Sequence, residues 1–305
     1  MEVVRGHRDV LAWERAAVAI GNFDGVHLGH RALIERARML AAAHDALTVV
    51  LTFDPHPSMV FSPATAPKQL TTITRRLELL GEAGADVVVV EPFTRELANS
   101  APHAFIDDIV VHALRASAIV VGYDFSYGAG RTGTTDALRA HGNRAGVEVD
   151  VVPAVELGGE IASSTRIRAH LRDGNLAAAE RLLGRRWDVD GIVGHGAKRG
   201  RTIGVPTANI LPHGDLPIAS GIYAVTLRID GTDRPAVASL GTNPTFVEAG
   251  AQTLEVHVLD WEGDLYDREV RTTFVARLRD ETKFDGVDAL VAQIRADIAA
   301  ARRLL

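Results

Sequence analysis

Two histidines, three residues apart, stand in a glycine-rich segment near the start of the chain. Residues 21–30 read GNFDGVHLGH, and the histidines are His27 and His30. If this segment opens a helix, the two imidazoles share one face of its first turn. Imidazoles at a helix N-terminus can donate hydrogen bonds to polyphosphate oxygens and stabilise the charge that develops when pyrophosphate leaves. The same pair could also hold a metal ion or be surface histidines of an ordinary turn.

A second anion-binding pattern lies further along the chain. Residues 163–168 read SSTRIR, where three hydroxyl residues precede an amphipathic turn. Such a cluster is typical of a helix N-cap. Its hydroxyls, the amides of the helix start and Arg168 together make an anion pocket. Alone the pattern would indicate only a helix cap, but together with His27 and His30 it predicts the opposite side of a triphosphate clamp.

The second half of the chain carries a set of oxygen ligands. Residues 200–209 read GRTIGVPTAN, and their glycines favour a backbone wrapped around a ligand, although a glycine-rich turn would look the same. Thr207 and Asn209 present a hydroxyl and an amide carbonyl on one side of an extended segment, a donor set that suits Mg²⁺ also held by phosphates. In the strand-like segment LEVHVLD, Glu255 and His257 point to one side, which fits either a catalytic carboxylate or a solvated face.

Residues 128–133 match the GxGxxG pattern of dinucleotide-binding folds. A strand-like segment precedes them, a helical one follows, and Glu148 or Asp150 stands near the acidic position that the pattern expects. That fingerprint normally opens the first strand–helix–strand unit, whereas this match follows the fourth predicted strand. A nicotinamide-dependent oxidoreductase is therefore the weaker interpretation of this segment.

Hydrophobic periodicity places these motifs on two kinds of architecture. Up to about residue 183, apolar runs alternate with amphipathic helical segments, which indicates a parallel sheet covered on both faces. Strand-like segments then follow one another, which is typical of a sandwich or barrel. We therefore predict an α/β domain over residues 1–184 and an all-β barrel with a C-terminal helix over residues 185–305. The predicted strands are 16–20, 47–53, 87–90, 118–121, 147–152, 189–193, 222–229, 236–240, 254–259 and 269–278, and the predicted helices are 31–43, 72–83, 102–114, 134–141, 164–171, 176–183 and 287–302.

Composition narrows the class of protein. The 305 residues are 47% hydrophobic and 24% charged and include no cysteine, which excludes a disulfide scaffold, a thiolate zinc site and a cysteine nucleophile. The net charge is −6, shared equally by residues 1–185 and 186–305, so neither half is a basic module that holds nucleic acid by its phosphates. The chain starts without an apolar signal core and has no apolar run long enough to span a bilayer. We expect a soluble cytoplasmic protein with no membrane or nucleic-acid partner.

The motifs of residues 16–172 resemble, in order, those of the nucleotidylyltransferase superfamily in the form found in prokaryotic bifunctional riboflavin kinase/FMN adenylyltransferases (FAD synthetases). Residues 21–30 look like the HxGH signature, and TFDPHP at 52–57 is similar to the second-strand motif. The loop GYDFSYG, followed by residues 130–133, resembles the flavin-side loop, and residues 163–168 resemble the second nucleotide-binding motif. The resemblance continues to the C-terminal helix through PTAN at 206–209 and through residues 221–225, 241–246 and 279–284.

This resemblance implies a Rossmann-like nucleotidylyltransferase domain, a riboflavin kinase-like barrel and a role for each motif residue. In the α/β domain, catalysis is expected from His27, His30 and Arg168, flavin contact from Asp124, and nucleotide binding from Gly21, Asn22, Phe23, Asp24, Gly29, Ser164 and Thr165. In the barrel, Glu255 is the expected catalytic base, and ATP phosphates are expected at Gly200, Gly204, Thr207 and Asn209, with Mg²⁺ on the last two. The roles of Asp124 and His56 are the least defined.

The chain is thus expected to carry out two ATP-dependent reactions. The barrel would phosphorylate riboflavin to FMN, and the α/β domain would join FMN to the AMP part of ATP, releasing pyrophosphate and forming FAD. The partners are then the small molecules ATP, riboflavin and FMN, and the sequence is compatible with weak self-association. The alternative is a single-activity FMN adenylyltransferase whose barrel binds flavin as a regulatory module. Trp261 and Asp267 depart from the family pattern, because they stand where phenylalanine and glycine are expected.

Overall fold

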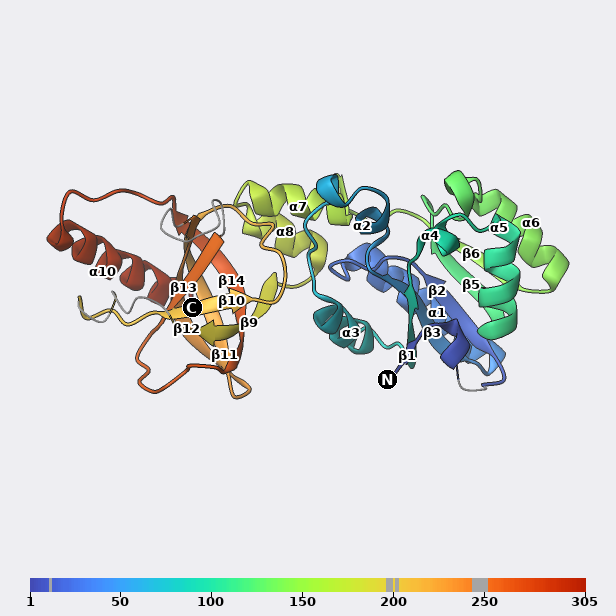
Figure 1. The fold of residues 1–305 in the computed structure, drawn as a ribbon, viewed down its shortest axis with the longest axis horizontal. Helices are drawn as coiled ribbons and strands as arrows, with labels where there is room; N and C mark the ends of the chain where they lie inside the picture. Colours follow the sequence, from blue (N-terminus) through green and yellow to red (C-terminus); the bar gives the residue numbers. More distant parts are fainter. Residues whose placement is uncertain (11–12, 196–199, 201–202, 243–251) are drawn as a thin grey trace. The chain divides into compact units, whose positions relative to one another are not determined.

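The computed structural model covers residues 1–305 and describes all of them except 11–12, 196–199, 201–202 and 243–251 (Figure 1). The described residues form two compact units. The first comprises Met1–Pro67 and Ile73–Ser163, and the second comprises Lys68–Thr72 and Ser164–Leu305. Among the described residues, one predicted motif set lies mainly in the first unit and the other lies in the second.

The first unit is built on a six-stranded, entirely parallel sheet. Its strands are β1 Glu2–Arg5, β2 Ala16–Ile20, β3 Leu47–Asp54, β4 Val87–Pro92, β5 Ala116–Gly122 and β6 Glu148–Val152. They are ordered β1-β4-β3-β2-β5-β6, so the direction of strand order reverses at β2. The predicted parallel sheet is confirmed. The sequence does not predict β1, because a four-residue edge strand that buries only Val4 produces no apolar run.

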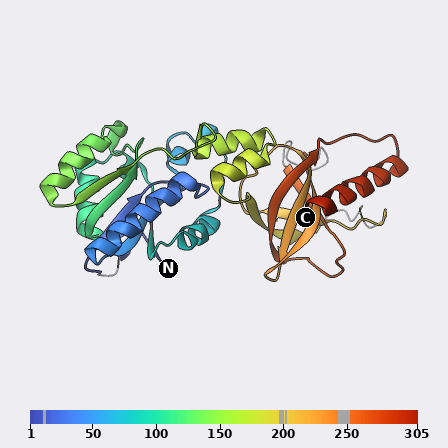
Figure 2. The same cartoon turned by 180° about the vertical axis from the view of Figure 1, so that it is seen from behind.

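Helices cover both faces of this sheet (Figures 1 and 2). On one face lie α1 (Leu28–His44) and α3 (Ile73–Glu82), and on the other lie η3 (Phe105–Ala113) and α6 (Thr135–Ala145). Because successive strand residues point to opposite faces, a continuous apolar run such as Val87–Val90 is buried on both sides. The core of the first unit therefore consists of two apolar layers with the sheet between them.

Shorter elements complete the first unit. They are η1 His7–Asp9, α2 Pro57–Phe61, η2 Pro63–Thr65, α4 Arg95–Ala98, α5 Pro102–Ala104, η4 Ala129–Arg131, β7 Glu156–Leu157 and β8 Glu160–Ile161. The single helix predicted over residues 102–114 is divided into α5 and η3. The latter has π-helical hydrogen bonds, such as the one that the N–H of Leu114 donates to the carbonyl of Ile109 at 2.9 Å.

The second unit contains a closed barrel of six antiparallel strands. The strands are β9 Asp188–Gly194, β10 Ala208–Pro212, β11 Gly221–Ile229, β12 Thr232–Thr242, β13 Gln252–Val258 and β14 Glu269–Arg279, in the order β10-β13-β12-β11-β14-β9. Helix α10 (Val287–Leu304) packs on β11, β12 and β14. The predicted barrel with its C-terminal helix is confirmed. The sequence does not predict β10, because glycines and Pro206 before it read as a turn.

Two helices and a short segment pack with the barrel, although they precede it in the sequence. α8 (Leu176–Leu183) contacts β14, and Leu171 of α7 (Ser164–Arg172) accepts a backbone hydrogen bond from Ala219 at 3.0 Å. Leu70 accepts a hydrogen bond from Trp187 Nε1 at 2.9 Å. The compact units therefore divide after Ser163, whereas the predicted domain boundary lies after residue 184. The change in hydrophobic periodicity marks the position where predicted helices end and predicted strands begin. It does not show whether a helix packs with the parallel sheet or with the barrel.

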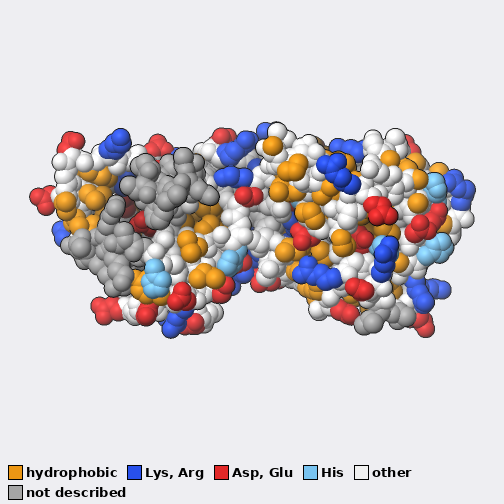
Figure 3. Space-filling model, viewed as in Figure 1, with side chains coloured by type: hydrophobic (Ala, Val, Ile, Leu, Met, Phe, Trp, Pro, Cys, Tyr) orange, Lys and Arg blue, Asp and Glu red, His pale blue; other side chains and the backbone are white. Residues whose placement is uncertain are grey.

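Acidic and basic side chains are interspersed over the described surface in Figure 3. This distribution agrees with the equal division of net charge between the two halves of the sequence. Among the helices that the structure describes, none combines the length and apolar character needed to cross a membrane.

Candidate active sites

The two motif histidines lie where β2 ends and α1 begins, at the carboxyl edge of the parallel sheet. His27 is the N-cap of α1, and its Nδ1 accepts a hydrogen bond from the backbone N–H of His30 at 3.3 Å. The imidazole rings stack with centroids 3.6 Å apart and planes inclined by 20°. Because strand order reverses at β2, this loop occupies the position where doubly wound sheets bind ligands. The structure thus brings the predicted pair together at the predicted edge.

His30 is half-buried, and its Nδ1 has no hydrogen-bond partner among the described residues. Burial lowers the pKa of His30 well below its usual value of 6.5, and electrostatic interactions with His27 and with the guanidinium of Arg76 lower it further. At neutral pH His30 is therefore uncharged, and it can donate one hydrogen bond to a phosphate oxygen. Gly29 keeps the pair close, because a Cβ there would lie 3.1 Å from the His27 ring and from the carbonyl of Ala162.

Four other residues of this loop are predicted to contact the nucleotide. Phe23 and Asp24 are only 0% and 1% exposed, so their side chains face the protein interior. Gly21 and Asn22 are half-buried, and their backbone groups hydrogen-bond to residues of β3 at 3.1 and 3.2 Å. Their contacts with ATP stay a prediction. The burial of Phe23 and Asp24 shows that these two side chains also support the loop from within.

Several aromatic side chains lie close together near β3 and β4 in the first unit. The sequence analysis does not predict them as site residues. Phe61 of α2 is 60% exposed, and its ring centroid lies 5.9 Å from that of Phe93. Phe93 in turn makes an edge contact with Phe53 at 5.6 Å. An exposed ring supported by further rings offers a surface on which a planar heterocycle can stack. No sequence pattern marks Phe61, because its exposure is decided by the fold.

Asp124, the predicted flavin contact, is exposed and follows β5. Since β5 pairs with β2, the loop that carries Asp124 lies at the same edge as the histidine loop. His56 caps α2, where its Nδ1 accepts a hydrogen bond from the backbone N–H of Ser58 at 3.2 Å and lies 2.7 Å from its hydroxyl. The structure thus gives His56 a capping role, and the flavin contact of Asp124 stays a prediction.

The residues of the second predicted anion pocket lie on α7. Ser164 and Thr165 form its first turn, and the side chain of Arg168 donates a hydrogen bond from Nε to the carbonyl of Lys68 at 2.7 Å. These residues belong to the second compact unit, whereas the histidine pair belongs to the first. Their joint action on one triphosphate therefore stays a prediction.

The residues predicted to act in the barrel meet across the neighbouring strands β10 and β13. Asn209 is the register partner of Glu255, and Thr207 donates a hydrogen bond of 3.4 Å from its hydroxyl to Glu255 Oε2. Thr207 and Glu255 are exposed, whereas Leu254 and Val256, on the other side of β13, are fully buried. The predicted alternation along β13 is confirmed, and a hydroxyl, an amide and a carboxylate lie together.

Backbone contacts hold the segment before β10. The carbonyl of Gly200 accepts a hydrogen bond from the N–H of Val205 at 2.8 Å. A Cβ on Gly200 would lie 2.2 Å from the carbonyl oxygen of Val205, so only glycine fits there. His257 Nδ1 lies 2.8 Å from the carbonyl of Pro206, which ties the segment to β13. The phosphate contacts predicted for Gly200 and Gly204 stay predictions.

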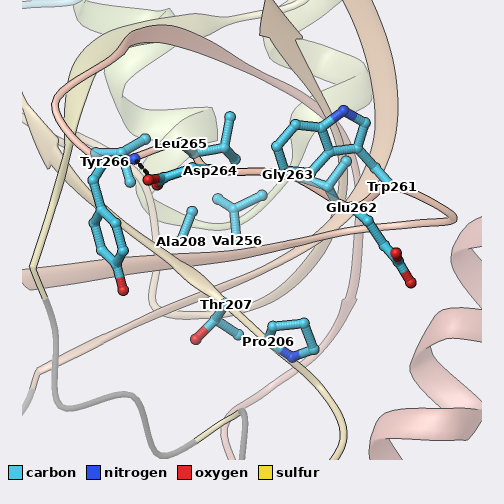
Figure 4. A pocket seen from close by; sticks show the side chains of 12 residues that line it. Pro206, Thr207, Ala208, Val256, Trp261, Glu262, Gly263, Asp264, Leu265 and Tyr266 are labelled. Atoms are coloured by element: carbon cyan, nitrogen blue, oxygen red, sulfur yellow. Dashed lines mark hydrogen bonds between the residues drawn. The ribbon is translucent and has the colours of Figure 1, made fainter.

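A cavity of about 370 Å³ adjoins Thr207. Figure 4 shows Trp261 and Tyr266 at opposite ends of the group of side chains that line it, with Val256 between them. The ring of His195 stacks on Tyr266 with centroids 4.3 Å apart and planes inclined by 19°. Apolar and aromatic walls beside a few polar groups are typical of a site for a planar heterocycle.

Both departures from the family pattern lie at or next to this cavity. Trp261 forms part of its wall. Asp267 follows the lining residue Tyr266 and has a φ of +61°, a left-handed conformation that glycine adopts without strain. That conformation explains why the family pattern has glycine at this position. The motif residues 201–202 and 243–246 lie outside the part of the chain that the structure describes.

The glycine-rich residues 128–133 do not form a dinucleotide cradle. Tyr127 and Gly133 pair with each other through two backbone hydrogen bonds, and α6 begins only beyond this closed loop. Glu148 and Asp150, the candidates for the acidic position, both pair with side chains of α1. The structure therefore does not support the nicotinamide interpretation.

Two nucleotide-suited sites on unlike folds within one chain are typical of a bifunctional enzyme that transfers phosphoryl and nucleotidyl groups. Comparison with known proteins agrees with this class. Residues 9–166 match the family model for FAD synthetase, and residues 183–305 match the family model for riboflavin kinase.

Curated relatives extend over the whole chain. A bifunctional riboflavin kinase/FMN adenylyltransferase from Pseudomonas fluorescens is 40% identical over 100% of this chain and 98% of its own. One of the same description from Escherichia coli K12 is 38% identical over 99% and 97%. A crystal structure described as a macrolide-efflux protein from Streptococcus pneumoniae has a TM-score of 0.88 at 32% identity and covers 99% of both chains. The chain belongs to the bifunctional riboflavin kinase/FMN adenylyltransferase family.

Proposed function

We propose that this chain catalyses two consecutive reactions. The second unit phosphorylates riboflavin with ATP to give FMN, and the first unit adenylylates FMN with a second ATP to give FAD and pyrophosphate. Both enzyme domains of the family are present, which favours two activities over an adenylyltransferase with a regulatory barrel. The observation that carries the kinase assignment is the 3.4 Å hydrogen bond between Thr207 and Glu255. A barrel that only binds flavin does not need a carboxylate next to a hydroxyl that can bind a metal ion.

In the kinase reaction, Glu255 accepts the proton of the riboflavin 5′-hydroxyl as that oxygen attacks the γ-phosphorus of ATP. The new O–P bond forms while the bond from the γ-phosphorus to the bridging oxygen breaks, and ADP leaves. Thr207 and Asn209 would hold Mg²⁺ with the phosphates, because their hydroxyl and amide oxygens and the nearby carboxylate form the hard donor set that this ion prefers. The bound ion would neutralise phosphate charge.

The cavity beside Thr207 is proposed to hold the adenine of the same ATP. If Thr207 meets the phosphates, the rest of that nucleotide extends away from Thr207 to the adenine, and the cavity that Thr207 lines offers room for this ring. Tyr266 and Trp261 supply aromatic surface for the ring. The open side of Glu255 then remains for riboflavin.

In the adenylyl transfer, an oxygen of the FMN phosphate attacks the α-phosphorus of ATP, the bond to the α–β bridging oxygen breaks, and pyrophosphate leaves. This nucleophile is already an anion, so no base has to remove a proton. His27 and His30 act by positioning and by donating hydrogen bonds to the phosphates. Phe61 offers a surface for the flavin ring, and Asp124 lies at the same edge to orient the substrate.

The remaining assignments belong to the same proposal. Residues 1–184 carry the adenylyltransferase and residues 185–305 the kinase, with Ser164, Thr165 and Arg168 as further ATP contacts of the former. A cytoplasmic location is proposed because both reactions consume ATP. Weak self-association stays a prediction.

Incubation of the full-length chain with riboflavin, ATP and Mg²⁺, followed by chromatographic separation of the flavins, tests the proposal. FMN should appear first and FAD later, with ADP and pyrophosphate as the two by-products. Formation of FAD from supplied FMN but never from riboflavin would favour the single-activity alternative. If neither FMN nor FAD formed, the proposed function would be wrong.

A further inference from the structure

A fully buried arginine lies in the first unit, and neither the sequence motifs nor the proposed mechanism uses it. Arg76 of α3 is 1% exposed and is the largest fully buried side chain among the described residues. Removing a guanidinium from water is costly unless charged or polar groups surround it. A buried guanidinium is stable only where neighbouring groups compensate its charge. The neighbours of Arg76 therefore indicate its role.

The neighbours of Arg76 connect it to the histidine loop. Its Nη1 donates a hydrogen bond of 3.3 Å to the carbonyl of Phe53, near the carboxyl end of β3. Burial lowers the pKa of Arg76, whereas the carboxylates of Asp24 and Asp54 raise it. Asp24 is itself only 1% exposed and belongs to the loop between β2 and α1. Thr52, next to Phe53, donates a hydrogen bond of 3.2 Å to the carbonyl of Asn22 in the same loop. The buried cation of Arg76 and the buried anion of Asp24 thus compensate each other where β3 meets the loop.

The loop needs such support because its backbone is strained. Phe23 and Val26 have φ values of +50° and +41°, a left-handed region that L-residues with side chains rarely adopt, least of all a β-branched one. Gly25 between them has a φ of +83°. Strained conformations of this kind persist only where the surrounding structure enforces them, and they cluster at functional sites. Asp24 lies in the middle of this strained stretch.

The charge of Arg76 also reaches the histidines, because it is one of the causes that lower the pKa of His30. A positive neighbour disfavours a second positive charge. Arg76 therefore helps to keep His30 neutral and able to donate a hydrogen bond without becoming a cation.

We propose that Arg76 is a positioning residue for adenylyl transfer, which through its attraction to Asp24 holds the loop of His27 and His30 in its strained conformation. Arg76 touches neither substrate nor the reacting atoms in this scheme. The inference rests on the proposed function, since it names a support for that same site.

Arg76→Met in the full-length chain tests this inference, with the kinase activity of the same molecule as the control for intact protein. The kcat for converting FMN to FAD should fall about 100-fold, the effect of a catalytic group misplaced by about one ångström. The kcat for converting riboflavin to FMN should not change. Arg76→Lys, which keeps the charge, should recover about tenfold of the lost rate.

Arg75→Met is the matched control. Arg75 is the preceding residue of α3 and is also buried, but its Nη1 donates to Glu78 at 2.8 Å and to Glu82 at 3.3 Å on its own helix. This variant should keep the rate of FAD synthesis within about threefold of that of the unsubstituted chain. An equal loss in Arg75→Met and Arg76→Met would overturn the inference, as would an unchanged rate in Arg76→Met.

NMR titration of the His30 imidazole measures its pKa, which would not change if Arg76 had only a structural role. The pKa of His30 should rise in Arg76→Met, because a positive neighbour is removed, and should stay constant in Arg76→Lys. If Arg76→Met does not fold, Arg76→Lys and Asp24→Asn test the inference in its place. Normal FAD synthesis in both of these variants would overturn the inference. Failure of the unsubstituted chain to make FAD from FMN would instead contradict the proposed function itself.

Discussion

The two units present their phosphate chemistry in opposite ways. In the first, the candidate residues sit on a buried loop with left-handed backbone at Phe23 and Val26, and His27 is only 6% exposed. In the second, Thr207 and Glu255 are exposed side chains at neighbouring strands of a regular barrel. One site is made from an enforced backbone conformation, and the other is made from side chains that a strand register brings together.

In the proposed reactions, the nature of the nucleophile accounts for this difference. FMN brings an ionised phosphate, so adenylyl transfer needs exact placement of donors but no base. Riboflavin brings a neutral hydroxyl, so its phosphorylation needs a carboxylate that is open to the substrate and can accept a proton. The comparison therefore predicts that variants of the two sites separate the two activities.

The largest effect is expected for Glu255→Gln. Loss of the base should slow FMN formation roughly 1,000-fold, within the range known for general-base catalysis, and leave the conversion of FMN to FAD unchanged. Glu269→Gln on β14 is the control, because this exposed carboxylate is engaged by His213 at 2.7 Å outside the proposed site. Rates are measured separately from riboflavin and from FMN. An equal loss of both activities in Glu255→Gln would break the two-site comparison.

His30→Asn should show the mirror pattern. Removing one donor to the developing phosphate charge should slow FAD synthesis about 100-fold, so FMN accumulates from riboflavin. His44→Asn, at the far end of the same helix and paired with Glu148, is the control and should make FAD at the normal rate. Flavin chromatography over time distinguishes the two. A normal FAD rate in His30→Asn would remove this residue from the site.

Tyr266→Ala tests whether the barrel cavity holds the adenine of ATP. Loss of ring stacking should raise the KM for ATP in the kinase reaction about tenfold, a change that corresponds to about 1.4 kcal/mol. The KM for riboflavin and the rate of FAD synthesis should not change. Steady-state kinetics with each substrate varied in turn provide the test. If the KM for riboflavin rose instead, the cavity would hold the flavin rather than adenine.

The smallest effect is expected for Asp267→Gly. Glycine relieves the left-handed strain at a φ of +61°, partly offset by its greater freedom in the unfolded chain, and should raise the free energy of unfolding of the barrel by about 0.5 kcal/mol. Asp267→Ala should lower it, because alanine keeps the Cβ that disfavours a left-handed backbone and loses the side chain with which aspartate can form local hydrogen bonds. Urea unfolding of both variants measures the difference. Equal stabilities would show that the backbone here carries no strain.

Much of the fold follows from the sequence, because apolar runs and their spacing report which side of each element is buried. The strands Ala16–Ile20 and Gly221–Ile229 agree closely with their apolar patterns, and α8 begins and ends at its predicted residues. The alternation around Glu255 shows that this carboxylate faces outward. These features are local, so neighbouring residues suffice to predict them. The short β1 is missed because it buries only Val4, and β10 is missed because the glycines and the proline before it resemble a turn.

The sequence alone also indicates two phosphate chemistries, since the order and types of residues in both motif sets are visible without a fold. It does not show that the rings of His27 and His30 stack, that Asp24 is buried, or that the buried Arg76 compensates the charge of Asp24. Hydrophobic periodicity predicts that a residue is buried, but it does not predict which residues it contacts. Those partners are set by the packing of α3 and β3 on the loop after β2, where charges from distant parts of the chain must compensate one another away from water.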